Sequence, residues 1–320
     1  MSATKTSTPF RIRRFEPERD FPALVQLINA IDAVDQAGEA TTEDEQREQL
    51  TWPGRDLVAD RWVATGFDQD NQLLGYGDSW KTPVAHTADI YVGVHPAWRR
   101  HGLGGELLRR TLVRAREQGA THVAVYADRN NSAADPFLQD HGFTVAGAFI
   151  ELHMPMPDAI EAPVWPTRYT LRRLSETRNI VSLVDVLNRS YGDRFGHKMT
   201  TETEIQDWGW LEPETAANIM LLFDENEALV GICRVRSDSD AQGSNDGMIG
   251  HLDAPGVVPT HRRSDLYRSL VLAGMEALRQ QGQTAIVLQS WGDEEHNIAD
   301  YCALGFAQQQ HSVAYQHRVA

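Results

Sequence analysis

A glycine-rich turn in the first half of the chain has the composition of an anion-binding site. Residues 92–110 read VGVHPAWRRHGLGGELLRR, in which a branched apolar run precedes the turn and leucines at helical spacing follow it. Gly102, Gly104 and Gly105 can take positive φ or let a ligand approach the backbone closely. Several N–H groups can then point at one anion at the start of the following helix, which predicts a diphosphate site.

The residues around the glycines narrow the kind of ligand. Arg99 and Arg100 add charge and hydrogen-bond donors, which suits a phosphorylated cosubstrate better than a neutral one. A P-loop would continue with Lys and Ser or Thr, but Glu106 stands there, and a dinucleotide fingerprint would carry a third glycine where Leu108 stands. The sequence therefore disfavours both a Mg-nucleotide site and a dinucleotide site.

The spacing of five of these residues matches one known motif. Val94, Pro96, Arg99, Gly102 and Gly104 follow the order V-x-P-x-x-R-x-x-G-x-G, which resembles the acyl-CoA-binding motif of the GNAT superfamily of N-acetyltransferases. The resemblance implies acetyl-CoA as cosubstrate and direct transfer without an acyl-enzyme. It also implies a strand that splays from its neighbour, so that pantetheine pairs with the strand's backbone and an amide N–H binds the thioester carbonyl.

The residues after this motif continue the resemblance. Asn131, Ala134 and Phe137 match the pattern N-x-x-A-x-x-[LF] of the superfamily's next helix, and Gly142 and Phe143 match its closing Gly-Phe pair. The asparagine of that pattern often contacts the pantetheine arm, although a helix N-cap is an equal alternative. The resemblance thus implies these cosubstrate-binding residues: Val92, Gly93, Val94, Arg99, Arg100, His101, Gly102, Leu103, Gly104, Gly105 and Asn131.

The whole pattern occurs twice in the chain. Residues 10–15 (FRIRRF) match residues 169–174 (YTLRRL), and Val257, Pro259 and Arg262 repeat the first copy's Val, Pro and Arg. We predict a GNAT domain over 10–153, an extended proline-rich linker over 154–166 and a second GNAT-like domain over 167–320. The tandem arrangement resembles the mycothiol synthase type of enzyme.

The fold implied by this resemblance is of the α/β (α+β) class with a mixed sheet. Each domain should have a central, mostly antiparallel sheet flanked by helices, with one splayed strand pair. In the second copy Asp265 and Tyr267 replace the two motif glycines, and Glu294 replaces Asn131. An acid beside a diphosphate is repulsive, so this copy should not bind acyl-CoA in the usual way. It would instead complete the fold or form a wall of the acceptor pocket.

The catalytic groups are less well defined than the cosubstrate site. Asp89 on the central strand is the candidate general base. The alternative is that Asp89 is only a solvated acid at the edge of the strand. Glu151 is a second candidate for the base. Families of this type often place a Tyr where Leu138 stands, and Tyr301 occupies that position in the second copy. The proton donor stays open between another acid such as Tyr126 and solvent, and Tyr301 is favoured as a core tyrosine without a catalytic role over a donor that acts from the second copy.

The first helices should form the acceptor side, as the resemblance implies. Residues 32–48 contain seven acids and a single basic residue, Arg47, so a cationic amine would be attracted there. The segment TTEDEQ at 41–46 also reads as a capping box that begins a helix, which needs no substrate.

Composition limits the partners and the compartment. The 320 residues include 45 acidic and 30 basic ones, which gives a formal net charge of -15, so nucleic acid and anionic membrane are disfavoured as partners. No apolar run approaches the length of a membrane span, and Cys233 and Cys302 fit reduced thiols, so we expect a cytoplasmic protein. The 12 histidines show no metal-ligand spacing, so we expect no metal.

These observations predict an N-acetyltransferase that moves an acetyl group from acetyl-CoA to a primary amine of a small molecule or peptide, with a small cationic acceptor favoured. One alternative is acetylation of a cysteinyl amine, as in the mycothiol synthase type. That type relies on its C-terminal domain, whereas here the glycine turn survives in the N-terminal copy. A non-catalytic acyl-CoA-binding sensor or assembly module is a second alternative. The acyl chain length and the oligomeric state stay open.

Overall fold

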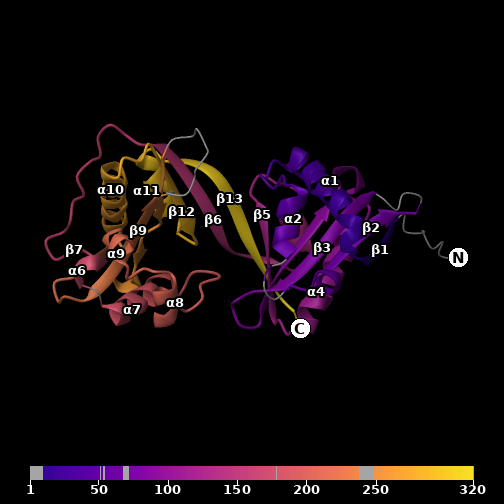
Figure 1. Cartoon of the computed structure of the whole chain (residues 1–320), viewed down its shortest axis with the longest axis horizontal. Coiled ribbons are helices and arrows are strands. Elements are labelled where there is room, and N and C mark those ends of the chain that lie inside the picture. Colours follow the sequence, from indigo (N-terminus) through magenta and orange to yellow (C-terminus); the bar gives the residue numbers. More distant parts are fainter. Residues whose placement is uncertain are drawn as a thin grey trace. The chain divides into compact units, whose positions relative to one another are not determined.

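The chain forms two compact units (Figure 1). The structure is a computed structural model that describes residues 10–50, 52, 55–67, 72–177, 179–237 and 248–319. Unit 1 comprises Met1–Ala146 and Val313–Ala320, and unit 2 comprises Gly147–Ser312. Within the described ranges, none of the helices combines the length and the apolar composition that crossing a bilayer requires.

Unit 1 alternates strands and helices around one sheet. Its elements in chain order are β1 (Phe10–Arg14), α1 (Pro17–Asp35), α2 (Glu43–Leu50), α3 (Leu57–Asp60), β2 (Arg61–Gly66), β3 (Leu73–Lys81), β4 (Thr87–Val94), η1 (Pro96–Trp98), α4 (Leu103–Glu117), β5 (His122–Asp128), α5 (Ala134–Asp140), the first residues of β6 (Thr144–Pro155) and the end of β13 (Ala307–Arg318). The strand order is β1-β2-β3-β4-β5-β13. Neighbours from β1 to β4 are antiparallel, whereas β4 and β5 are parallel.

Apolar residues cover both faces of this sheet. On one face α1 presents Leu24, Ile28 and Ile31, which pack with Val63 and Tyr76. On the other face α4 presents residues at helical spacing, and a side chain at Gly75 or Gly77 would touch it. The β-strand period of two therefore assigns the residues of β4, and those of β3 from Gly75 onward, to one helix layer or the other, whereas a register shift at Leu74 interrupts the alternation.

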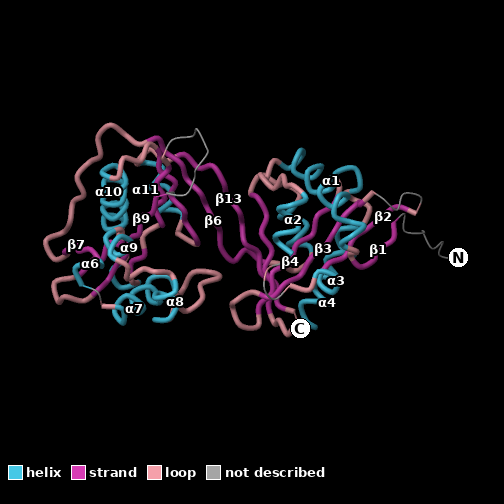
Figure 2. The backbone as a smooth tube through the Cα atoms, viewed as in Figure 1, coloured by secondary structure: helices cyan, strands magenta, loops and turns pink. Residues whose placement is uncertain are grey.

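Unit 2 repeats this architecture, as the helices and strands in Figure 2 show. Its elements are the rest of β6, β7 (Thr170–Arg173), α6 (Leu174–Thr177), α7 (Ile180–Tyr191), α8 (Glu202–Asp207), α9 (Pro213–Ala217), β8 (Ile219–Phe223), β9 (Leu229–Ser237), β10 (Ile249–Asp253), β11 (Gly256–Val257), η2 (Pro259–His261), α10 (Ser264–Gln280), β12 (Ala285–Trp291), α11 (Glu295–Ala303) and the start of β13. The strand order is β6-β12-β10-β9-β8-β7, and β10 and β12 form the parallel pair. The predicted α/β class, with mostly antiparallel strands flanked by helices in each unit, is confirmed.

A repeated hydrogen-bond pattern supports the common origin of the two units. The side chain of Asn29 donates to the carbonyl of Thr41 at 3.0 Å and accepts from its N–H at 2.7 Å. Asn188 bonds Thr200 in the same way, at 2.9 and 2.7 Å. The residue that follows each threonine then caps a short helix, so the same local device begins α2 in unit 1 and α8 in unit 2.

The units do not coincide with the predicted domains 10–153 and 167–320. Most of β6, from residue 147 onward, belongs to unit 2 and pairs with β12, while the C-terminal residues from 313 belong to unit 1. There Tyr315 donates to Asp135 and the N–H of Val319 bonds Thr121. The boundaries of the units therefore differ from those of the predicted domains, because most of β6 lies in unit 2 and the second half of β13 lies in unit 1.

The proline-rich segment predicted as a linker lies on unit 2. Residues 156–166 form no helix or strand, as expected. The segment is held, however, because Ser269 donates to the carbonyl of Val164 at 2.8 Å and Arg268 pairs with Glu161 at 2.7 Å. It is thus a packed part of unit 2 rather than a separate spacer.

Candidate active site

The central strands of unit 1 lie side by side only at their beginnings. The parallel pairing joins residues 87–89 to 122–124 and then stops, although β4 continues to Val94 and β5 to Asp128. β4 stays paired with β3 to its end. Because an antiparallel ladder uses alternate backbone groups, the last residues of β4 keep N–H and C=O groups on the edge away from β3. The expected splay is therefore present in unit 1.

The chain leaves β4 through a turn that opens the N-terminus of α4. Arg100 has a φ of 65° and Gly102 a φ of 80°, and Gly102 is the N-cap of the helix without a side-chain cap hydrogen bond. The first N–H groups of an α-helix have no intrahelical acceptor. Those of Leu103, Gly104 and Gly105 can therefore serve an anion, and the buried Leu103 side chain anchors them.

The two motif glycines are needed for different reasons. A Cβ at Gly102 would meet nothing within 4 Å, so the left-handed backbone alone favours glycine there. A Cβ at Gly104 would make ordinary contacts, at 3.5 Å from the Phe137 ring and 3.7 Å from Val94. A methyl group fits at this second position, but a longer side chain would project into the space beside the end of β4.

Gly102→Ala should lower the free energy of unfolding by about 1–2 kcal/mol, because an L-residue is strained at positive φ. Gly104→Ala is the matched control and should not lower it, because its Cβ fits and glycine inside a helix is itself unfavourable. Urea denaturation of both variants measures the difference. Equal stability of the two variants would contradict the assigned backbone conformation.

The Arg99 side chain is held by an ion pair inside unit 1. It donates to both oxygens of Asp35 at 2.8 and 2.7 Å and to the carbonyl of Val94 at 3.3 Å. In unit 2, Arg262 bonds Asp193 at 2.6 and 2.7 Å and the carbonyl of Val257 at 3.2 Å. The same arginine–aspartate pair thus occurs in unit 2, which lacks the two motif glycines. This favours a role of Arg99 in shaping the turn, and phosphate binding by Arg99 stays a prediction.

The other polar residues of the motif lie around this pair. Arg100 is exposed, and its guanidinium has no hydrogen-bond or ion-pair partner among the residues that the structure describes. His101 is exposed and its Nδ1 lies 2.8 Å from the carbonyl of Arg99. Asn131 donates to Asp35 at 3.2 Å and accepts from the N–H of Ala133, which is itself the N-cap of α5. Asn131 is therefore not the cap residue.

Asp89 and Tyr126 lie on the same face of the sheet. Their neighbours Ala88, Ile90 and Val125 pack in the core under α4, so the pleat turns Asp89 and Tyr126 to the opposite face. Burial raises the pKa of the Asp89 carboxyl to about 6, although Arg55 acts in the opposite direction. Burial and then the nearby Asp89 raise the pKa of Tyr126 to about 12. Both groups have the ionisation expected of a base and an acid near neutral pH.

A cavity of about 560 Å³ opens on this face of unit 1. It lies between the α1–α2 segment and strands β2 to β4, and its size is in the range of small-molecule sites. It is lined by Ile28, Gly38, Glu39, Ala40, Thr41, Glu45, Gln46, Glu48, Gln49, Trp52, Arg55, Arg61, Tyr76, Asp78, Trp80 and Tyr91. Three of the seven acids predicted at the acceptor side, Glu39, Glu45 and Glu48, belong to this lining, and the capping box of Thr42 and Glu45 is also present.

Several cavity residues were not singled out from the sequence. Tyr76, Asp78 and Trp80 alternate along β3 and share the cavity face, which the period of two in LLGYGDSWK could have indicated. Tyr91 stacks on Tyr76 with ring centroids 4.9 Å apart and donates to Glu39 at 2.9 Å. Arg55 precedes the short helix α3, and no pattern among its neighbours in the sequence indicates a functional role for it.

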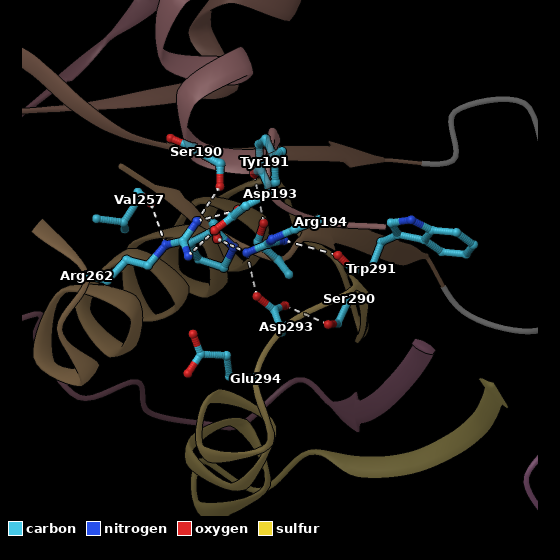
Figure 3. A network of polar contacts seen from close by, with 12 residues as sticks. Ser190, Tyr191, Asp193, Arg194, Val257, Arg262, Ser290, Trp291, Asp293 and Glu294 are labelled. Carbon is cyan, nitrogen blue, oxygen red and sulfur yellow. Dashed lines mark hydrogen bonds and ion pairs between the residues drawn. The ribbon is translucent and has the colours of Figure 1, made fainter. Parts of the chain in front are cut away.

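The equivalent region of unit 2 is filled by side chains (Figure 3). Arg194 pairs with Asp293 at 2.6 Å, and their side chains are only 7% and 0% exposed. The guanidinium also donates to the carbonyls of Pro255, after β10, and Trp291, at the end of β12, both at 3.4 Å. Ser290 donates to the second Asp293 oxygen at 2.6 Å. The Arg194 guanidinium thus bonds backbone carbonyls at the carboxyl ends of both parallel strands, β10 and β12. In a splayed strand pair, this place would be open to a ligand.

The remaining candidates of the sequence lie in cores or away from the cavity. Tyr301 is 0% exposed in unit 2, and burial raises its pKa well above the usual value. Leu138 is buried in the core under α4. Glu151 lies in unit 2, 2.7 Å from His153. Asp89 and Tyr126 lie on the cavity face of the sheet in unit 1 but are not among the residues that line the cavity.

Comparison with known proteins agrees with this geometry. The model of the acetyltransferase (GNAT) family matches residues 26–143 and again residues 180–306. Mycothiol acetyltransferase from Thermobispora bispora is 29% identical over 70% of this chain and 74% of its own. The protein of the same name from Salinispora tropica is 27% identical over 94% and 98%.

Two solved structures have a similar fold over almost the whole length of the chain. A GCN5-related N-acetyltransferase from Sphaerobacter thermophilus has a TM-score of 0.68 at 19% identity and covers 97% of this chain and 96% of its own. A tandem GNAT protein from the clavulanic acid biosynthesis pathway has a TM-score of 0.59 at 16% identity, over 97% and 99%. At these identities the likeness shows the fold. Because the family model matches both halves, the chain belongs to the GNAT family of acetyltransferases and carries its domain in tandem.

Proposed function

We propose that this enzyme transfers the acetyl group of acetyl-CoA to a primary amine, with one acetyl-CoA bound per chain, in unit 1. The observation that carries the proposal is the contrast between the units. Unit 1 has a splayed strand pair and an uncapped helix N-terminus at Gly102, whereas Arg194 and Asp293 fill the corresponding region of unit 2.

The cosubstrate would be held mainly by backbone groups. Its diphosphate fits the N–H groups of residues 102–105, with Arg100 as an exposed cation beside them. Its pantetheine arm would pair with the free edge of residues 92–94, and an N–H there would bind the thioester carbonyl. A Cβ at Gly93 would lie 3.0 Å or less from Tyr76 and Ile31, so glycine lets β4 pass close to α1.

The acceptor would enter from the cavity side, where Asp89 and Tyr126 lie. The amine nitrogen bonds to the thioester carbon while Asp89, directly or through one water, takes the proton that the nitrogen loses. The carbon–sulfur bond then breaks, and Tyr126 gives its proton to the departing thiolate. Its raised pKa keeps Tyr126 protonated at neutral pH, which a donor requires.

Tyr126→Phe should lower kcat by about 100-fold or more, the usual contribution of a general acid, with little change in CoA affinity. Tyr301→Phe is the matched control, because that hydroxyl is fully buried in unit 2. Steady-state kinetics with monitored CoA release measure both variants. Unchanged kcat in Tyr126→Phe would assign protonation to solvent, and a large loss in Tyr301→Phe would transfer the role to unit 2.

A second candidate acceptor is suggested by the relatives. The most similar curated proteins named above are mycothiol acetyltransferases, which favours a cysteinyl amine on a small thiol. Incubation of acetyl-CoA with a panel of primary amines, including cysteinyl amines, tests both candidates by mass spectrometry of N-acetyl products. Absence of any N-acetylated product would contradict the proposed activity.

A further inference from the structure

Arg55 is a nearly buried guanidinium for which the described part of the chain supplies an ion pair but no hydrogen-bond acceptor. Its side chain is 9% exposed and lines the cavity of unit 1. Its nearest carboxylate oxygen, on Asp78, is 3.8 Å away, which is too far for a hydrogen bond. None of its side-chain nitrogens has a hydrogen-bond partner in the described part of the chain. A guanidinium in this state is costly unless a ligand completes its bonding.

The carboxylate nearest to Arg55 is already used by another arginine. Arg61 donates to the same Asp78 oxygen at 3.1 and 2.5 Å, and the second oxygen accepts the N–H of Ser79 at 3.0 Å. Asp89 is the other cavity-face acid whose charge reaches Arg55, and it is the proposed base. The cavity lining thus has two guanidinium groups and one carboxylate, Asp78, which already accepts hydrogen bonds at both oxygens.

Aromatic rings fix the orientation of Arg55. Its guanidinium lies over the Trp80 ring, 4.3 Å from the centroid, and 5.4 Å from the centroid of Trp52. A stacked guanidinium keeps its N–H groups in its own plane, in the fork geometry that bonds a carboxylate twice. Trp80 is also opposite Asp89 in the β3–β4 register, so a group held at Arg55 lies beside the start of the splay.

The rim of the cavity has the opposite charge. Glu39, Glu45 and Glu48 line the cavity and are exposed to solvent, whereas Gln46 is buried. An acidic rim attracts an ammonium group and disfavours a doubly charged phosphate more than a singly charged carboxylate. The cavity therefore has a basic floor and an acidic rim, which suits a ligand that carries both charges.

We propose that Arg55 binds a carboxylate of the acceptor, so that the substrate class is amino acids or short peptides whose amine is acetylated while their carboxylate is held at the cavity floor. This inference rests on the proposed amine acetylation for its substrate role. The binding of a carboxylate at Arg55 can be measured without turnover.

The first test compares L-amino acids with their carboxamides as acceptors of the unmodified protein, together with phosphoethanolamine and ethanolamine. We expect kcat/KM to be about 10-fold or more higher for the acid of at least one pair, the usual effect of a charge-assisted bond. Equal or higher values for every carboxamide would overturn the proposal. A preference for phosphoethanolamine over all carboxylates would overturn it in favour of a phosphate ligand.

Arg55→Gln then separates recognition from structure. It should reduce kcat/KM for the preferred acid by about 10-fold or more and leave its carboxamide within about 2-fold. Arg55→Lys keeps the charge but lacks the planar fork of N–H donors. Its kcat/KM for the preferred acid should therefore lie between the values of the unmodified protein and of Arg55→Gln. The control is Arg47→Gln, an exposed arginine that pairs with Glu43 and does not line the cavity. Equal losses for acid and carboxamide would make Arg55 structural and overturn the proposal.

Calorimetry with N-acetyl amino acids and their amides gives the readout that does not need activity. If no amine is acetylated, the proposed function fails, but binding of the acids that is lost in Arg55→Gln still supports the carboxylate site. Absence of binding of any acid by the unmodified protein overturns it. If circular dichroism finds Arg55→Gln unfolded, the acid-to-amide ratio of Arg55→Lys decides, and an unchanged ratio there overturns the proposal.

Discussion

Asp89→Asn should lower kcat/KM by about 100-fold to 10,000-fold, because an amide cannot accept the proton that the amine loses. Affinity for CoA should be unchanged, since Asp89 lies at the base of the splay and not at the glycine turn. The matched control is Glu151→Gln, which removes an acid that lies in unit 2. Steady-state kinetics together with calorimetric CoA binding separate the two effects.

The pH profile of the unmodified enzyme gives an independent check of the same residue. Burial raises the pKa of Asp89 to about 6, so the carboxylate becomes protonated as the pH falls through that value. Log kcat/KM should then decrease with decreasing pH below about 6, and this limb should be absent in Asp89→Asn. A profile that is the same in both proteins, or activity within a few-fold in the variant, would contradict the assignment of the base.

Gly104→Tyr should abolish CoA binding and turnover together. The change copies Tyr267 of unit 2, and the long side chain would extend from the first turn of α4 toward Phe137 and Val94, beside the backbone edge proposed for pantetheine. Gly104→Ala should retain binding, because its Cβ makes only ordinary contacts. Calorimetric titration of the two variants with CoA measures the effect. Retained affinity in Gly104→Tyr would contradict the position of the cosubstrate.

The glycine turn could be predicted from the sequence because its signals are local. A branched strand, a proline, positive-φ glycines and a leucine-rich helix follow one another over residues 92–110 and need no distant partner. The structure accordingly has β4, η1 and α4 in this order. The faces of Asp89 and Tyr126 follow from strand alternation in the same way.

Contacts between distant segments could not be predicted. The assignment of most of β6 to unit 2 depends on pairing of residues 149–155 with β12, and nothing in either strand specifies its partner. The pair of Arg99 with Asp35 joins residues 64 positions apart, so the sequence predicts only a phosphate-binding role for Arg99. Arg55 was missed because its role depends on the strands around it.

Unit 2 contains one feature that the sequence predicts and one that it does not. Its replacement of glycines by Asp265 and Tyr267 is visible in the sequence and predicts loss of the cosubstrate site. The buried pair of Arg194 and Asp293 is not visible, because the two residues come from different ends of the unit and neither belongs to the motif. The structure therefore adds a physical reason why the region is closed.

The number and place of bound cosubstrate molecules test the account most directly. Calorimetric titration of the unmodified chain with CoA should give one site, and amide hydrogen exchange with saturating CoA should protect residues 92–105 and leave the exchange of residues 254–267 unchanged. Two sites per chain, or protection at 254–267 instead of 92–105, would contradict the assignment of unit 1 as the acetyl-CoA-binding unit.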